Sequence, residues 1–131
     1  MKEITIGTKG SASLTVTASE LAVNVGSGSL EVLATPVMIM LMEKAACSAL
    51  EPFLEGDETT VGTQMNADHV AATPQGMKVT AQAEVTAVNG REISFCVTAS
   101  DEYGEIGRGT HKRFLVFGER FTQKAKAKLT R

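Results

Sequence analysis

The sequence predicts an α+β fold in which an antiparallel sheet wraps around one long apolar helix. Two observations predict it. Residues 36–50 are apolar nearly all round a helix, which is typical of a buried helix rather than a surface one. After residue 60, apolar and polar residues alternate with a period of two, which is typical of strands with one buried face. The chain has 131 residues, 43% of them hydrophobic and 21% charged, so we expect one ordered domain over 1–131.

The helix has signals at both of its ends. Thr35 can cap its N-terminus, and Pro36 suits the first helical position, where a missing N–H costs nothing. Pro52 and Gly56 mark the C-terminal end of the same apolar helix. No other long apolar element is available to cover the apolar face of the strands.

The strands are predicted from alternating segments that turn signals separate. A Gly- and Ser-rich stretch over 24–30 is expected to be a loop. Asn89-Gly90 is a hairpin turn, because both residues tolerate positive φ. Residues 118–128 either form a short basic helix or fray. The expected strands are residues 11–17 before the helix and residues 61–71, 77–87, 93–99 and 105–117 after it.

Two strands carry further detail. Between residues 61 and 71 the odd positions, which include Val61, Thr63 and His69, are expected to share the inner face. Gly107 and Gly109 in the last strand indicate a bulge or a close backbone approach.

A helix wrapped by a curved antiparallel sheet is the hot-dog architecture; the alternatives are other α+β folds with one helix on a sheet. Because the helix is apolar on both sides, we expect more apolar surface to be buried in a homodimer, by edge-to-edge pairing of the sheets.

Composition excludes several classes of partner. The net charge of −2 argues against general nucleic-acid binding, although the chain from Arg108 onward is basic. No apolar run approaches the ~20 residues of a membrane span. The N-terminus lacks the apolar core of a secretory signal. Cys47 and Cys96 lack metal or disulfide spacing and are expected to be buried and reduced, so we expect a cytoplasmic protein.

Glu43 stands out among the residues that could carry chemistry. Its neighbours one helical turn away are all apolar, and burying a carboxylate costs free energy unless a partner charge or donors compensate. It is therefore a candidate base or nucleophile; the alternative is that it reaches solvent beside Lys44.

His69 and Thr35 are the other candidates. His69 lies at an odd position of its strand and is expected to face the core or a pocket, as a structural or a functional histidine. Thr35 places a hydroxyl at the positive end of a helix. On a regular helix Thr35 and Glu43 are about 12 Å apart along the axis, so they cannot touch. A third residue, a dimer interface or an irregular helix start would have to join them.

Other motifs are absent from the sequence. No nucleotide-binding, nucleophile-elbow or metalloprotease motif occurs. The two histidines and two cysteines are scattered, so no metal site and no cofactor are expected. His111 lies in a strand rich in Gly and basic residues and is expected to be exposed.

The segment ATPVMIMLMEKAACSALEPFLEGDETTVGTQMNADHVAATPQGMKVTAQAEV and the strand IGRGTHKRF resemble the fluoroacetyl-CoA thioesterase-like family of hot-dog proteins. The resemblance runs from about Ala34 to Phe114. Its most specific parts are LMExA in the helix, HxAATPxG and GxGTHxR.

The resemblance implies a catalytic set of Thr35, Glu43 and His69. It also implies that the backbone approaches the acyl group closely at Gly62, and that Arg113 lies near the active site and coenzyme A. The segment before the helix differs from the family. Members specialised for a small halogenated acyl group carry aromatic residues there, whereas residues 20–34 contain none. The resemblance therefore implies the chemistry but leaves the acyl group open.

We expect an acyl-CoA thioesterase with His69 as general base. Thr35 would be the nucleophile or position a water, and Glu43 would orient the imidazole or attack the carbonyl itself. Arg113 and the basic C-terminal stretch would meet coenzyme A phosphates. Two alternatives remain open: a hot-dog hydratase or dehydratase acting on acyl thioesters, and a non-catalytic acyl-CoA-binding module.

Overall fold

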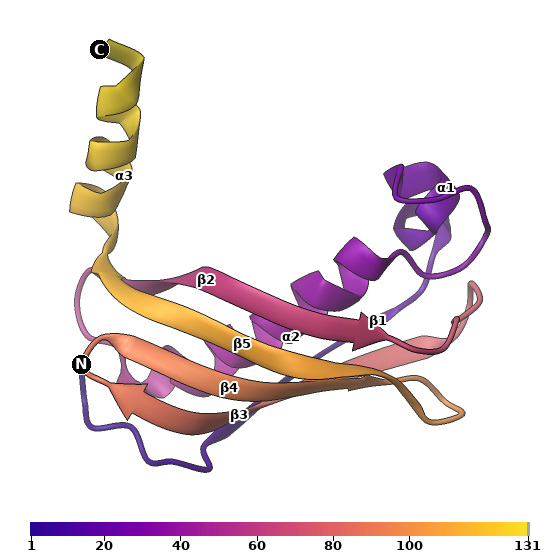
Figure 1. Cartoon of the computed structure of the whole chain (residues 1–131), viewed down its shortest axis with the longest axis horizontal. Coiled ribbons are helices and arrows are strands. Elements are labelled where there is room, and N and C mark those ends of the chain that lie inside the picture. Colours follow the sequence, from indigo (N-terminus) through magenta and orange to yellow (C-terminus); the bar gives the residue numbers. More distant parts are fainter. Residues whose placement is uncertain (131) are drawn as a thin grey trace.

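A computed structural model of the chain describes residues 1–130. Five antiparallel strands form one sheet in the order β1-β3-β4-β5-β2, and the sheet curls around α2 (Figure 1). The strands and main helices are β1 (Lys9–Thr15), α1 (Ala22–Val25), α2 (Thr35–Leu50), β2 (Glu58–His69), β3 (Lys78–Asn89), β4 (Glu92–Ser100), β5 (Glu105–Phe117) and α3 (Gly118–Lys126). Short 3₁₀ turns span Ala18–Glu20, Glu51–Phe53 and Ala127–Thr130.

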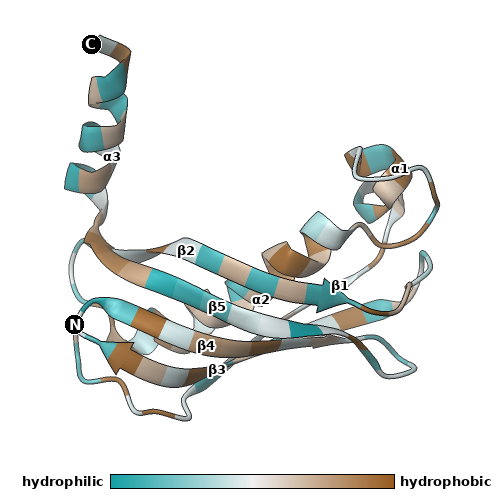
Figure 2. Ribbon diagram, in the orientation of Figure 1, coloured by the Kyte–Doolittle hydropathy of each residue, from teal (hydrophilic) through white to brown (hydrophobic). Residues whose placement is uncertain are grey.

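Helix α2 supplies one side of the core, as the sequence predicts. Its inner face is fully buried against the sheet. Figure 2 shows brown apolar and teal polar residues alternating along the strands of that sheet. The opposite face is less covered than an all-apolar helix suggests, because Met40 is 38% exposed. The buried residues of α2 are Met38, Leu41, Met42, Ala45, Ala46, Ala49 and Leu50.

The start of α2 differs from the expectation. Thr35 is the first helical residue rather than the cap, and Ala34 occupies the cap position without a side-chain hydrogen bond. The Thr35 hydroxyl is therefore free to bond to another element. Pro36 lies in the first turn, as predicted, because its ring already has a helical φ.

A bulge in β2 corrects the predicted alternation. The pairing of β2 with β5 shifts between Gly62 and Gln64, so one extra residue, Thr63, is inserted. Before the bulge the even positions, Thr60 and Gly62, face α2, and after it the odd positions do. His69 consequently faces inward as predicted, whereas the prediction was wrong for Val61, which precedes the bulge, and for Thr63, which is exposed.

Gly107 and Gly109 are explained by close approach. A Cβ on Gly107 would overlap the Met38 side chain, and one on Gly109 would overlap the backbone of Asn66. These two glycines let β5 lie tightly against α2 and β2, which confirms that prediction. The Asn89-Gly90 hairpin is also confirmed, with φ of 61° at Gly90.

The cysteines do not lie where the sequence predicts. Cys47 and Cys96 are both unpaired, but both are exposed rather than buried. Cys47 lies on the face of α2 turned away from the sheet, and Cys96 lies on the outer face of β4. The prediction from their apolar neighbours was therefore wrong, because only one face of α2 and one face of β4 are covered.

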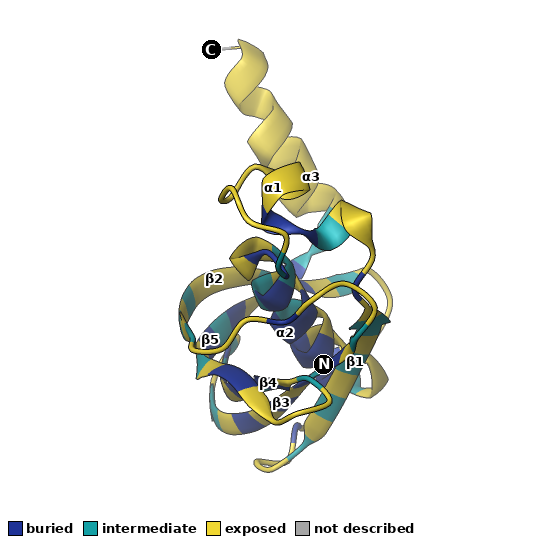
Figure 3. Cartoon of the chain, turned by 90° about the vertical axis from the view of Figure 1, so that its right-hand side faces the viewer, coloured by how far each residue is buried: buried dark blue, intermediate teal, exposed yellow. Residues whose placement is uncertain are grey.

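Two segments extend beyond the body of the fold. Residues 17–33, which contain α1, form an irregular segment that a single bridge between Leu21 and Leu33 closes. At the other end α3 follows β5 and projects away from the sheet (Figures 1 and 3), with no buried residue. The C-terminal stretch is therefore helical over Gly118–Lys126 rather than frayed.

Candidate functional site

Thr35 and His69 form a hydrogen-bonded pair at one end of the molecule. Thr35 begins α2, His69 ends β2, and the distance between Oγ1 and Nδ1 is 2.7 Å. The His69 Nε2 atom is buried and has no hydrogen-bond partner among the described residues. Burial lowers the pKa of His69 below its usual value, and the Ala71 backbone opposes this shift. The imidazole is therefore biased toward its neutral form.

A neutral imidazole beside a hydroxyl is suited to proton transfer. In the tautomer with the proton on Nε2, the lone pair on Nδ1 accepts the hydrogen bond that the Thr35 hydroxyl donates. The same nitrogen can then take the proton when Thr35, or a water in its place, attacks a carbonyl. Thr35 also lies at the positive end of the α2 dipole, where developing negative charge is stabilised.

A pocket of about 290 Å³ adjoins this pair. Its wall comes from the 17–33 segment and from the residues that follow β2. Its lining residues include no Phe, Tyr or Trp, and they combine aliphatic with polar side chains. Besides Thr35 and His69, the lining residues are Ala22, Ser27, Val32, Leu33, Val70, Ala71 and Ala72.

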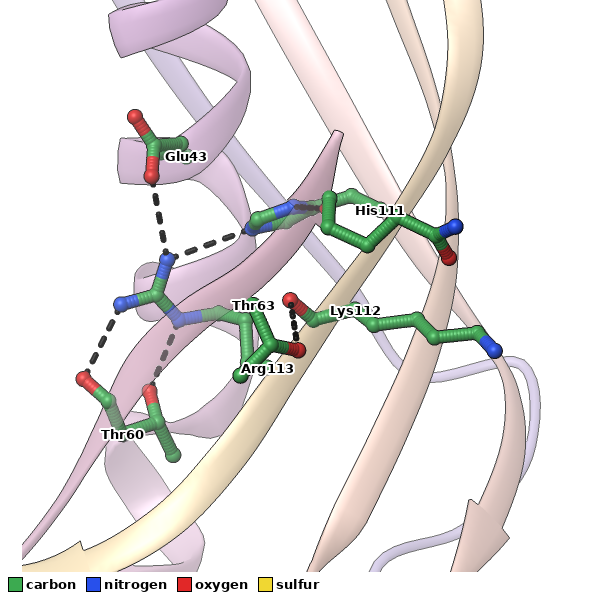
Figure 4. Close-up of polar contacts among 7 residues, drawn as sticks. Glu43, Thr60, Thr63, His111, Lys112 and Arg113 are labelled. Carbon is green, nitrogen blue, oxygen red and sulfur yellow. Dashed lines mark hydrogen bonds and ion pairs between the residues drawn. The ribbon is translucent and has the colours of Figure 1, made fainter. Parts of the chain in front are cut away.

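A second cluster surrounds Arg113 on β5 (Figure 4). Its guanidinium donates from Nε to Thr60 Oγ1 at 2.8 Å and from Nη2 to the Thr60 carbonyl at 3.0 Å. Nη1 lies 3.7 Å from Glu43 Oε2 on α2. The Glu43 side chain is 43% exposed, so it reaches solvent, which is the alternative that the sequence left open, with Arg113 as a nearby opposite charge. Only 7% of Arg113 is exposed, so it faces the protein interior rather than presenting a free cation to solvent.

His111 completes this cluster. The sequence did not predict its place there. His111 was expected to be exposed but is 1% exposed, because odd positions of β5 face α2. Its Nδ1 donates to the Gln64 carbonyl at 2.7 Å, so in the neutral ring Nε2 accepts from Arg113 Nη1 at 3.2 Å. The apolar Leu115, four residues later and therefore on the same face of the strand, was the sequence signal that could have placed it.

Gly62 lies close to the Glu43 and His111 side chains. A Cβ at this position would lie 2.9 Å from Glu43 Oε2 and 3.3 Å from His111 Cε1. A pocket of about 230 Å³ opens beside these groups. A side chain on residue 62 would push against the Glu43 carboxylate, so glycine keeps the carboxylate accessible from this pocket.

The two histidines lead to a prediction about stability. Burial is the largest cause of the lowered pKa at His111 as at His69, and the Arg113 charge adds to it at His111. A group with a lowered pKa in the folded state binds fewer protons there than in the unfolded chain. The stability that the two neutral histidines contribute is therefore fully present above their unfolded pKa of about 6.5. It is lost as the pH falls below that value.

The free energy of unfolding should accordingly decline between pH 7.5 and 5.5. Urea denaturation at a series of pH values, followed by far-UV circular dichroism, measures this slope. His111→Gln and His69→Gln should each make the slope shallower, because the chain has only 2 histidines. A slope that both substitutions leave unchanged would contradict the prediction.

The structure unites the predicted residues in two groups rather than one. Thr35 pairs with His69, and Glu43 lies with Gly62 and Arg113. No residue lines both pockets, and among the described residues no hydrogen bond or ion pair joins Glu43 to His69. The helical spacing that separated Thr35 from Glu43 in the sequence is thus retained in α2.

Metal and membrane sites are not indicated. Among residues 1–130, no cluster of three or more metal-ligating side chains occurs. Over the same residues, no helix is both long and apolar enough to cross a membrane.

Known proteins are similar to this chain in both sequence and fold. The profile of a family described as "FlK: Fluoroacetyl-CoA-specific thioesterase" matches residues 16–119. The fluoroacetyl-CoA thioesterase of Streptantibioticus cattleyicolor is 45% identical over 98 residues, which are 75% of this chain and 70% of that protein.

Two solved structures agree with these matches. One is a variant of the fluoroacetyl-CoA-specific thioesterase FlK in complex with fluoroacetate and CoA, with a TM-score of 0.85 and 35% identity over 90% of this chain and 99% of that one. The other is a hot-dog-like protein from Thermanaerovibrio acidaminovorans, with a TM-score of 0.85 and 21% identity over 95% and 93% of the two chains. The predicted hot-dog fold is confirmed.

Proposed function

Because the chain belongs to the fluoroacetyl-CoA-specific thioesterase family and is a thioester hydrolase, we propose that it cleaves acyl-CoA with Thr35 and His69 at the reacting carbonyl. The observation that supports this most is the 2.7 Å hydrogen bond between Thr35 and His69 beside a pocket. The products are a carboxylic acid and free coenzyme A.

His69 acts as the general base in this proposal. It accepts a proton from Thr35 or from a water that Thr35 holds. If Thr35 attacks, a bond forms from Oγ1 to the acyl carbon and the bond from carbon to sulfur breaks. The thiolate takes its proton from the His69 imidazolium, and a water then releases the acid from Thr35. If water attacks directly, the acid forms in one displacement.

Glu43 enters the same site from a second copy of the chain. Strand β2 is an edge strand of 12 residues, and an exposed edge of this length is suited to pairing. His69 and Gly62 are 7 positions apart on it, about 23 Å in an extended strand. A two-fold axis midway between them would place His69 of one copy opposite Gly62 and Glu43 of the other. The homodimer thereby assembles the Thr, His and Glu set that one chain divides.

The acyl group is proposed to be small and apolar. The aliphatic side chains of this pocket, among them Val32 and Leu33, would hold the acyl group by apolar contact, while Ser27 and Thr35 add polar groups. Fluoroacetyl-CoA, the substrate for which the relative is named, is a first candidate. Acetyl-, propionyl- and butyryl-CoA, which share its short length, test whether fluorine matters when no aromatic side chain lines the pocket.

Free-thiol release from this panel tests the activity. Wild-type protein should release coenzyme A, and His69→Ala should lower kcat/KM by about 10²–10⁴-fold, the usual contribution of a general base. Asp68→Ala is the matched control, because Asp68 is the exposed neighbour on the same strand. Release that His69→Ala leaves intact would refute the assignment. Binding of the panel without any release would instead indicate an acyl-CoA-binding protein, and conversion of the acyl chain without release a hydratase.

A further inference from the structure

Helix α3 has an apolar pattern that its own chain covers only in part, because Phe121 lines a hollow with Phe114 and Phe117 of β5. None of its residues is buried, although Phe121, Ala125 and Leu129 lie four residues apart along the C-terminal stretch and form an apolar stripe. Phe121 is 44% exposed and Leu129 is 87% exposed. A helix of 9 residues is marginal without a surface to pack against, so this stripe needs a cover.

The direction of α3 is fixed by its base. The Gly118 N–H donates to the Asp57 carbonyl at 3.0 Å, and the Glu119 N–H donates to Asp57 Oδ2 at 3.1 Å. The Arg120 guanidinium lies 5.3 Å from the centre of the Phe117 ring. These contacts hold the first turn of α3 against the sheet, so the helix projects in a defined direction.

That direction leads past the free edge of β2. Figure 1 shows α3 and the 17–33 segment at opposite ends of β2, both extending beyond it on the same side. The end-on view of Figure 3 shows both above the body of the fold. If two copies pair their β2 edges about a two-fold axis, as the proposed function requires, the axis exchanges these ends. The α3 of one copy then lies beside the 17–33 segment of the other.

The two surfaces are complementary in chemistry. Residues 17–33 contain two carboxylates, Glu20 and Glu31, and no Lys or Arg. Helix α3 contains three cations and one carboxylate. Both surfaces also carry exposed apolar side chains, which in the 17–33 segment are Val23, Val25 and Leu30, exposed by 45%, 42% and 68%.

We propose that α3 of each copy docks on the 17–33 segment of its partner and closes the acyl pocket of that partner. The 17–33 segment supplies Ala22, Ser27, Val32 and Leu33 to the pocket beside Thr35 and His69. Holding this segment in place therefore shapes the pocket in trans. In each active site the partner chain then supplies both Glu43 and the α3 helix that covers the 17–33 segment.

Hydrogen exchange tests the contact without relying on activity. Phe121→Asp places a charge on the apolar stripe, and Gln123→Asp places the same charge two residues on, on the opposite face of α3. With the dimer verified by sedimentation, Phe121→Asp should raise amide exchange in residues 17–33 by about tenfold, and Gln123→Asp should not. A dimer in which Phe121→Asp leaves this exchange unchanged overturns the docking alone. A monomeric wild-type chain overturns the docking together with the dimer, whereas thiol release still judges the hydrolase separately.

Mixed dimers test whether the effect acts in trans. When a His69→Ala chain pairs with a Phe121→Asp chain, the working His69 faces an intact α3, so KM should equal that of wild type. When a chain with both substitutions pairs with wild type, the working His69 faces the altered α3, and KM should rise about tenfold with kcat unchanged. The reverse pattern, or equal KM in both dimers, overturns the proposal.

Discussion

Thr35→Val is expected to lower kcat/KM by about 10²–10³-fold while the fold and the binding of substrate persist. Valine matches the shape of threonine and removes only the hydroxyl, which donates to His69 Nδ1 across 2.7 Å. Thr35 is exposed at the first residue of α2, and Ala34 occupies the cap position, so the hydroxyl has no capping role to lose. The loss should therefore appear in kcat rather than in stability.

Thr35→Ser is the conservative companion to Thr35→Val, and a trapping experiment separates the two routes that the geometry allows. Serine keeps a hydroxyl within reach of His69, so activity should stay within about tenfold of wild type in both routes. Acid quench followed by mass spectrometry then decides between them. An acyl mass on the peptide that carries Thr35 identifies the nucleophile, and a burst of thiol without it indicates direct attack by water. Full activity in Thr35→Val would contradict both routes.

Local patterns predicted most of the fold because each depends on neighbouring residues. The all-apolar run with Pro36 at its start predicted α2, and Asn89-Gly90 predicted the hairpin between β3 and β4. His69 was predicted to face inward from the parity of its own strand. Its partnership with Thr35, 34 residues earlier, came only from the resemblance, since no local pattern relates residues so far apart.

The errors have a common physical origin in pairing between distant segments. The bulge at Thr63 is set by how β2 aligns with β5, and the alternation within β2 does not reveal it. His111 was judged by the charges around it, whereas its burial is decided by which face of β5 meets α2. Cys47 and Cys96 show the converse. Their apolar neighbours in sequence predicted burial, but both side chains are exposed.

Arg113→Met should produce the largest loss of stability, with the free energy of unfolding lowered by about 2–4 kcal/mol. Methionine fills much of the same volume but leaves the Thr60 hydroxyl and carbonyl and His111 Nε2 without the donors that Arg113 supplies. Buried acceptors without donors are costly. Urea denaturation followed by far-UV circular dichroism measures the loss.

Arg108→Met is the matched control for Arg113→Met. Arg108 lies on the same strand but faces outward, and its pair with Glu105 is between side chains that are 58% and 42% exposed. Such surface pairs contribute about 0–1 kcal/mol, so the control should lose little. Equal losses in the two variants would mean that the buried hydrogen bonds of Arg113 contribute nothing.

Glu43→Gln separates stability from catalysis within the same cluster. Its carboxylate is 3.7 Å from Arg113 Nη1 and its side chain is 43% exposed, so the ion pair itself should contribute less than about 1 kcal/mol. The proposed site, however, uses the charge of Glu43 beside the His69 of the partner copy. Glu43→Gln should therefore unfold nearly as wild type does yet lose thiol release about 10²-fold or more. A variant that keeps its activity would remove Glu43 from the catalytic set, and one that unfolds as readily as Arg113→Met would make the ion pair the main support of the cluster.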